Sequence, residues 1–156
     1  MSRPRYENEQ TLAEEQRFRS IVENKHPEFV LRKLPISYGY DFACLRERDG
    51  SLAAFIEYRQ RNYTFQKLQE LGGYRISLQK WERLHGWAER FNVKCLFYVH
   101  LANCLPTQFY RYQIHRGTIG QMSLVWWDNP KRGDWQDNEL AVVLPCEDLE
   151  LIDFIT

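Results

Sequence analysis

Long apolar runs and CxxC cysteine pairs are both missing from the sequence. A membrane-spanning helix needs about 20 mostly apolar residues, so we expect no membrane span, and we also expect no signal peptide. Four separate cysteines are present, and two of them lie in apolar strand patterns: Cys44, Cys95, Cys104 and Cys146. Reduced, buried thiols in an intracellular, cytoplasmic protein fit this distribution better than disulfides or a zinc site.

The sequence also lacks internal repeats, low-complexity tracts and any basic residue after Arg132. Seven of the 21 acids follow Arg132, so residues 1–132 carry 21 basic and 14 acidic side chains, a net charge of +7. A basic body with an acidic end is compatible with a polyanionic partner, although this charge is a weak signal when spread over a domain. The length of 156 residues fits one domain covering 1–156.

Residues 40–61 read as two strands joined by the turn Asp49-Gly50. An Asp-Gly pair is a strong hairpin signal because glycine accepts the positive φ that a tight turn needs. Period-two alternation in the second strand gives two mostly apolar faces. A strand that is covered on both faces is expected in the middle of a sheet.

Each strand of this hairpin carries one acid where an apolar residue would be expected. Asp41 begins the first strand and Glu57 lies near the end of the second, so an antiparallel pairing should bring both carboxylates to one end of the sheet. Two carboxylates repel each other unless a cation or a proton lies between them. The residues alone leave two explanations open: a metal site, or ordinary pairing with nearby arginines.

Two helices are expected on either side of the hairpin. The first runs from Thr11 to about Asn24, with Thr11 as its N-cap and Glu14 completing a capping box. Helical spacing gives it a buried stripe of Phe18, Ile21 and Val22, with Glu14 inside the stripe and Glu15 at its edge. The second helix runs from Leu78 to about Phe91, with Ser77 as its N-cap and a core stripe of Leu78, Trp81, Leu84, Ala88 and Phe91.

Further strands are expected at 29–34, 93–101, 109–115, 120–127 and 141–144. The third and fourth of these should form a hairpin through Gly117. We expect 62–76 and 127–139 to be irregular because of their Gly, Pro, Asn and Asp residues, and 149–155 to pack back on the body.

Basic and aromatic residues mix after the hairpin, and Lys80 follows at the start of the second helix. The mix, which includes Arg61, Tyr63, Lys67 and Arg75, either contacts phosphates and bases or packs as a loop with solvated charges; the residue types slightly favour packing. A cation near a helix N-terminus is mildly unfavourable against the helix dipole. Lys80 therefore needs solvent exposure or an anionic partner.

The order helix, strand, hairpin, helix, strand resembles the PD-(D/E)xK nuclease superfamily, particularly its small resolvase-like or phage-encoded members. Asp41 opens the second core strand, and Glu57-Tyr58-Arg59 stands sixteen residues later in the place of the E-x-K motif. The helix start ISLQKW, at 76–81, also fits. The resemblance implies an α/β fold with a restriction-endonuclease-like αβββαβ core over about 11–101. Its central mixed sheet is flanked by helices, and a β extension covers about 107–156.

The same resemblance implies a metal site and a substrate. Asp41, Glu57 and the backbone carbonyl of Tyr58 would bind Mg²⁺ (or Mn²⁺), a cation that prefers hard oxygen ligands. A helix-borne acid, Glu14 or Glu15, would complete the site. DNA is the implied partner, and a homodimer is compatible with the resemblance. The residues that would contact nucleic acid are Arg61, Tyr63, Lys67 and Arg75.

This sequence departs from the motif at Arg59, where the family has a lysine that orients the attacking water. Arginine grips phosphate through two donors but cannot act as a base. In one interpretation Lys80 supplies the missing amine, and the protein is a magnesium-dependent DNA endonuclease using Asp41, Glu57, Arg59 and Lys80. In the other, the site has lost catalysis and the protein binds nucleic acid or a protein partner, for example as a phage-encoded factor acting on a host system.

Overall fold

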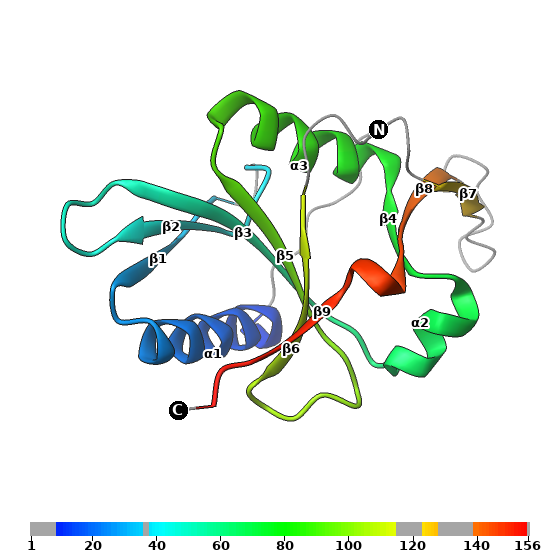
Figure 1. Ribbon diagram of the computed structural model, residues 1–156, viewed down its shortest axis with the longest axis horizontal. Coiled ribbons are helices and arrows are strands. Elements are labelled where there is room, and N and C mark those ends of the chain that lie inside the picture. Colours follow the sequence, from blue (N-terminus) through cyan, green and yellow to red (C-terminus); the bar gives the residue numbers. More distant parts are fainter. Residues whose placement is uncertain (1–8, 36–37, 115–122, 128–138, 156) are drawn as a thin grey trace.

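The computed structural model describes residues 9–35, 38–114, 123–127 and 139–155. In these residues two sheets are surrounded by helices (Figure 1). The helices are α1 (Glu9–Lys25), α2 (Phe65–Leu71) and α3 (Leu78–Phe91), with a 3-10 turn at Cys146–Asp148. The strands are β1 (Phe29–Lys33), β2 (Phe42–Arg46), β3 (Leu52–Gln60), β4 (Tyr74–Ser77), β5 (Lys94–His100), β6 (Gln108–Gln113), β7 (Ser123–Trp127), β8 (Glu139–Leu144) and β9 (Glu150–Asp153).

The larger sheet has six strands in the order β1-β2-β3-β5-β6-β9. Strands β3 and β5 are parallel and the other neighbours are antiparallel, so the sheet is mixed. The predicted αβββαβ core is confirmed as α1, β1, β2, β3, α3 and β5, with α2 and β4 inserted between β3 and α3. The hairpin turn at Asp49-Gly50 is confirmed as well, with Gly50 at a φ of 70°.

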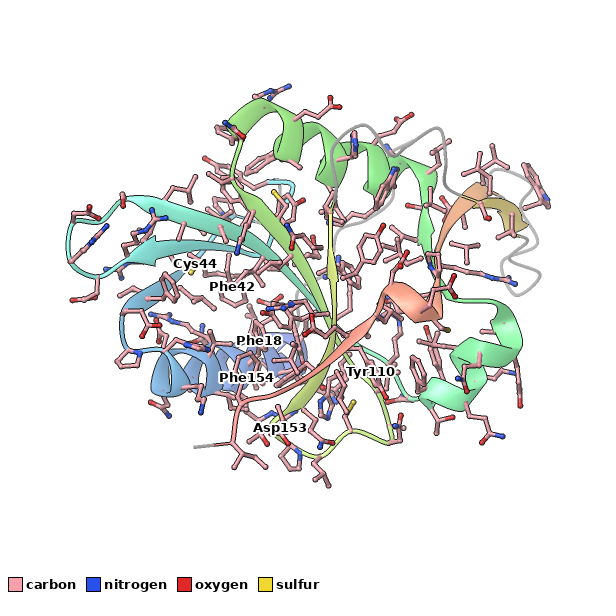
Figure 2. The ribbon with its side chains drawn as sticks, viewed as in Figure 1. Phe18, Phe42, Cys44, Tyr110, Asp153 and Phe154 are labelled. Atoms are coloured by element: carbon pink, nitrogen blue, oxygen red, sulfur yellow. The ribbon has the colours of Figure 1, made fainter. Side chains whose placement is uncertain are left out.

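Helices α1 and α3 cover opposite faces of this sheet (Figure 1). On the α1 face, Phe18 is fully buried and its ring stacks on Tyr58 with centroids 4.7 Å apart. Figure 2 shows Phe18, Phe42 and Phe154 gathered between α1 and the strands. On the other face Trp81 of α3 is fully buried in the core that also contains Phe97. Strand β3 is therefore covered on both sides, as its two apolar faces predicted.

Three details of the predicted helices are wrong. Helix α1 begins at Glu9, so Thr11 lies inside it and is not the N-cap. Its buried stripe includes Glu15, which is 4% exposed, because residues 15, 18 and 22 share one helical face. In α3 the Ser77 cap is confirmed by its bond from the Lys80 amide, but Phe91 is 45% exposed at the helix end and does not belong to the core stripe.

The segment 62–76 is ordered rather than irregular. Thr64 caps α2 by accepting from the Lys67 amide, and Gly72 ends the helix in the left-handed conformation at a φ of 84°. Strand β4 then pairs with β8 in a second sheet of order β4-β8-β7. Helix α2 has only seven residues, too few for a helical period to be recognised in the sequence. The partner of β4 lies about 70 residues along the chain, which local pattern does not show.

The predicted hairpin through Gly117 is also wrong. Strand β6 pairs with β5 and β9 in the large sheet, whereas β7 pairs with β8 in the small one. Gly117 itself and most of the predicted loop 127–139 lie outside the described residues. The predicted strand at 141–144 is confirmed within β8, whereas the segment 149–155, expected only to pack back on the body, contains the unpredicted strand β9.

The four cysteines are free, and Cys44 and Cys95 are buried, as expected. Within the described ranges, every helix is too short or too polar to span a membrane.

Candidate functional site

The antiparallel register of β2 and β3 brings the two hairpin acids together. Phe42 pairs with Ile56, so Asp41, one residue earlier, stands beside Glu57 at the same end of the sheet. The amide of Tyr58 donates to Asp41 Oδ2 at 2.8 Å, which fixes the Asp41 carboxylate against β3. The structure thus brings the two carboxylates together at one end of the sheet, as predicted.

Glu57 is completely buried, and a cation contacts each of its oxygens. Arg59 Nη1 lies 2.6 Å from Glu57 Oε1, and Lys80 Nζ lies 2.8 Å from Glu57 Oε2. Lys80 also donates to the carbonyl of Gly39 at 3.2 Å. The N-terminal position of Lys80 in α3 therefore has an anionic partner, and that partner is the motif glutamate.

The Arg59 head group lies where the predicted metal ligands converge. Its Nη1 atom is 2.6 Å from Glu57 Oε1, 3.3 Å from Asp41 Oδ2 and 2.7 Å from the carbonyl oxygen of Tyr58. These are the three groups that the resemblance assigns to the metal. One guanidinium nitrogen thus stands in for a cation among them, while the Arg59 side chain as a whole remains 33% exposed.

Lys33 joins the helix-borne acid to this cluster, and sequence reasoning missed it. Its Nζ lies 3.1 Å from Glu15 Oε2 and 3.6 Å from Asp41 Oδ1. Lys33 ends β1 opposite Phe42, so the pairing of β1 with β2 places it next to Asp41. A basic residue at the end of an apolar strand was the only local signal, because the pairing itself is not visible in the sequence.

The structure also distinguishes between the two candidate helix acids. Glu15 is buried and belongs to the cluster through Lys33. Glu14 is half-buried, and its Oε1 accepts from Gln10 at 3.4 Å along the exposed side of the helix. Six side chains of alternating charge therefore form one chain of contacts: Glu15, Lys33, Asp41, Arg59, Glu57 and Lys80.

Burial and charge move the pKa values of the two central acids in opposite directions. Burial raises the pKa of Glu57 to about 7, with the Asp41 charge adding to the shift and the Arg59 and Lys80 charges opposing it. Burial also acts to raise the pKa of Asp41, but its interaction with Glu57, the Arg59 charge and the Tyr58 amide outweigh burial, so that pKa is lowered. The Glu57 and Asp41 charges raise the pKa of Arg59 against its own burial, so the guanidinium stays protonated.

The four predicted nucleic-acid contacts are not equally close to this cluster. The Arg61 guanidinium lies 5.8 Å from the ring centre of Tyr74, and Arg61 directly follows β3 beside half-buried Tyr63. Arg75 lies on β4, next to Tyr74. Lys67 is on α2, where its 53% exposed side chain lies 3.8 Å from Glu70. The structure thus places Arg61 and Tyr63 near Tyr74, Arg75 on the opposite face of β4 from Tyr74, and Lys67 on a separate helix.

The donor set has the chemistry that a hard divalent cation prefers: two carboxylates and a backbone carbonyl. Among residues that the structure describes, no three His, Cys, Asp or Glu side chains are grouped closely enough to hold a metal by themselves. The point shared by the three donors is filled by Arg59 Nη1. The residues present can therefore coordinate a metal ion, provided that the Arg59 head group has moved away from the shared point.

Comparison with known proteins gives a family and distant structural likenesses. A family model described as "Phage putative PDDEXK endonuclease" matches residues 1–152. Among solved structures, the chain is similar to Hjc, a Holliday junction resolvase from the archaeal hyperthermophile Archaeoglobus fulgidus. The identity is 12% and the TM-score 0.46, over 81% of this chain and 84% of that one. This likeness is too distant to bear on function, and a search of curated proteins finds no match.

Proposed function

The chain belongs to the phage PDDEXK endonuclease family, and on that premise we propose that it is a DNA endonuclease that hydrolyses phosphodiester bonds with Mg²⁺ or Mn²⁺. One observation supports this most directly: Asp41, Glu57 and the Tyr58 carbonyl converge on a single point at the end of β3. Oxygen donors that share one cation position are the arrangement a hard metal ion requires.

Asp41, Glu57 and the Tyr58 carbonyl would hold the ion, with Glu15 linked to them through Lys33. A divalent cation bound there polarises the phosphodiester and lowers the pKa of the attacking water. Glu57 is fully buried, so its carboxylate keeps a fixed position against which substrate and water can be aligned.

Lys80 takes the role that the motif lysine has in the family. Its ammonium lies 2.8 Å from Glu57 and remains 24% exposed, so it can also reach a group that enters from solvent. An ammonium is a compact donor with three N–H groups, suited to orienting a water and to stabilising negative charge on the phosphorus oxygens. Arg59 cannot act as a base, and its planar fork is better suited to gripping a phosphate.

DNA would approach over the partly exposed cations of the cluster. The side chains of Lys33, Arg59 and Lys80 are 22%, 33% and 24% exposed above much more buried acids. Arg61, which directly follows β3 and lies over the Tyr74 ring, extends this basic surface. Basic side chains above a carboxylate cluster offset its charge and let a polyanion come close.

A second candidate function is a DNA-binding protein that no longer cuts. The observation in its favour is Arg59 Nη1 at the point where a metal would bind. In this case the basic surface binds the DNA backbone, with affinity that falls steeply as salt rises, and added metal produces no cleavage.

Cleavage assays separate the two candidates. Supercoiled plasmid, linear duplex and branched DNA are incubated with the protein in Mg²⁺, Mn²⁺ or EDTA, beside Asp41→Asn and Glu57→Gln. Glu82→Gln, an exposed acid on α3, is the matched control. The endonuclease proposal expects metal-dependent nicking by wild type and Glu82→Gln only. Equal cleavage by all four proteins would reveal a contaminant and refute it, and salt-dependent binding without cleavage would establish the second candidate.

A further inference from the structure

We propose that Arg59 is a built-in occupant of the metal position and leaves it when a DNA phosphate takes the guanidinium, so that DNA and metal bind cooperatively. The inference rests on the proposed function in one respect, namely that DNA is the ligand. It concerns the arginine that distinguishes this chain from the E-x-K motif.

Arg59 and a metal ion exclude each other by distance. Nη1 lies 2.6 Å from Glu57 Oε1 and 2.7 Å from the Tyr58 carbonyl, and both oxygens would have to coordinate the ion. Mg²⁺ binds oxygen at about 2.0–2.1 Å, so an ion held by the same oxygens would compete with Nη1 for the space between them. The ion can bind only after the guanidinium has moved.

Arg59 is held strongly in the free protein. It neutralises a fully buried carboxylate and a second one, Asp41, that is 14% exposed on its side chain. Removing a cation from buried carboxylates leaves them with uncompensated charge, which is costly in a poorly solvated site. A metal ion alone must therefore displace a well-placed competitor, and we expect it to bind weakly.

A phosphate changes this balance because it offers the guanidinium an alternative anion. Among the described residues, the contacts of the Arg59 head group all use Nη1, and the side chain is one-third exposed. Guanidinium groups bind phosphate through two parallel N–H bonds, which compensates the loss of the carboxylate contacts. The vacated carboxylates then receive the metal ion as their cation.

This exchange links the two ligands thermodynamically. If DNA raises the affinity for metal, metal must raise the affinity for DNA by the same factor. Couplings of this kind are commonly on the order of tenfold or more. Arg59 would thus keep the free protein nearly metal-free and load the site on DNA.

The test is a Mn²⁺ titration followed by the electron paramagnetic resonance signal of free Mn²⁺, with and without a short DNA duplex. Glu57→Gln with the same duplex gives the Mn²⁺ bound by DNA itself, which is subtracted. For wild type we expect DNA to raise Mn²⁺ affinity about tenfold. Arg59→Ala should bind Mn²⁺ about tenfold more tightly without DNA and gain little when DNA is added.

Lys80→Met is the matched control for charge, because Lys80 contacts the other oxygen of Glu57. It removes one positive charge from the same carboxylate without emptying the shared point. We expect a smaller gain in Mn²⁺ affinity than for Arg59→Ala, and a DNA effect that persists. Equal gains in the two variants would refute occupancy by Arg59 and indicate a general charge effect.

Two further outcomes keep the inference separate from the endonuclease proposal. Cleavage by a wild type whose Mn²⁺ affinity does not respond to DNA would overturn the inference and leave the endonuclease proposal standing. DNA-coupled Mn²⁺ binding without cleavage would support the inference and refute the endonuclease proposal. If Arg59→Ala does not fold, Arg59→Gln takes its place with the same expected gain in Mn²⁺ affinity, and a gain no larger than that of Lys80→Met would refute occupancy by Arg59.

Discussion

Replacing Glu57 by glutamine should remove a specific loss of stability that the wild-type protein suffers as pH rises. Burial raises the pKa of Glu57 to about 7 in the folded protein, against its ordinary value of 4.5. Between these two pH values the folded protein keeps a proton on Glu57 that the unfolded chain has released. The folded state therefore binds more protons, and the free energy of unfolding falls as pH rises.

The size of this loss follows from the pKa shift. At about 1.4 kcal/mol per pKa unit, the Glu57 shift corresponds to ~3 kcal/mol, lost between about pH 4.5 and pH 7. Asp41 does not act in this window, because its lowered pKa makes a contribution to stability that is present above its ordinary pKa of 3.8 and is lost only as pH falls further. The two acids therefore change the free energy of unfolding in different pH ranges.

The assay is urea unfolding at pH 5.0 and pH 7.5, with EDTA present so that no metal contributes. Wild type should lose ~2 kcal/mol more than Glu57→Gln between the two pH values, because this interval covers most of the Glu57 shift and glutamine has no proton to release. Glu82→Gln should behave as wild type, since Glu82 is exposed. A wild-type pH dependence equal to that of Glu57→Gln would mean that Glu57 is ionised throughout, with Arg59 and Lys80 fully offsetting its burial.

Three further outcomes are expected. Lys80→Met should lower the cleavage rate on the order of 10²-fold, as for loss of a positioned proton donor, whereas Lys94→Met, an exposed lysine on β5, should not change it in the same plasmid assay. Arg61→Ala should weaken DNA binding for all sequences alike and reduce the slope of log affinity against log salt by about 1, measured by fluorescence anisotropy; an unchanged slope would exclude a phosphate contact. Phe18→Ala should lower the free energy of unfolding by about 3–5 kcal/mol, because a fully buried ring stacked on Tyr58 is lost; a loss below about 1 kcal/mol in urea unfolding would contradict this packing.

The hairpin and its acids could be predicted because their signals are local. Asp49-Gly50 fixes the turn, and the pleat then determines that Asp41 and Glu57 share one end of the sheet. The family resemblance added the order of helices and strands, which the structure confirms. By contrast β4 and β7 join a second sheet through β8, and such long-range pairing leaves no periodic trace in the segments involved.

Only some of the ion pairs within the site could be predicted from the sequence. Lys80 could be proposed as a member of the site because a lysine near a helix N-terminus is stabilised by an anionic partner. Lys33 could not, since its role depends on the pairing of β1 with β2 and on Glu15 facing the core. The choice of Glu15 over Glu14 also depended on which face of α1 meets the sheet, and Glu15, Phe18 and Val22 form that face.

The charge balance of the cluster explains why the binding of metal and the binding of DNA affect each other. When all six side chains are ionised, Glu15, Asp41 and Glu57 carry three negative charges and Lys33, Arg59 and Lys80 carry three positive ones. A divalent ion added to a neutral, partly buried cluster leaves an excess of two positive charges there, and a phosphodiester added alone leaves an excess of one negative charge. Added together they leave an excess of only one positive charge, and the guanidinium can follow the phosphate rather than remain beside the metal. Electrostatics therefore favours binding of the metal together with DNA over binding of the metal alone.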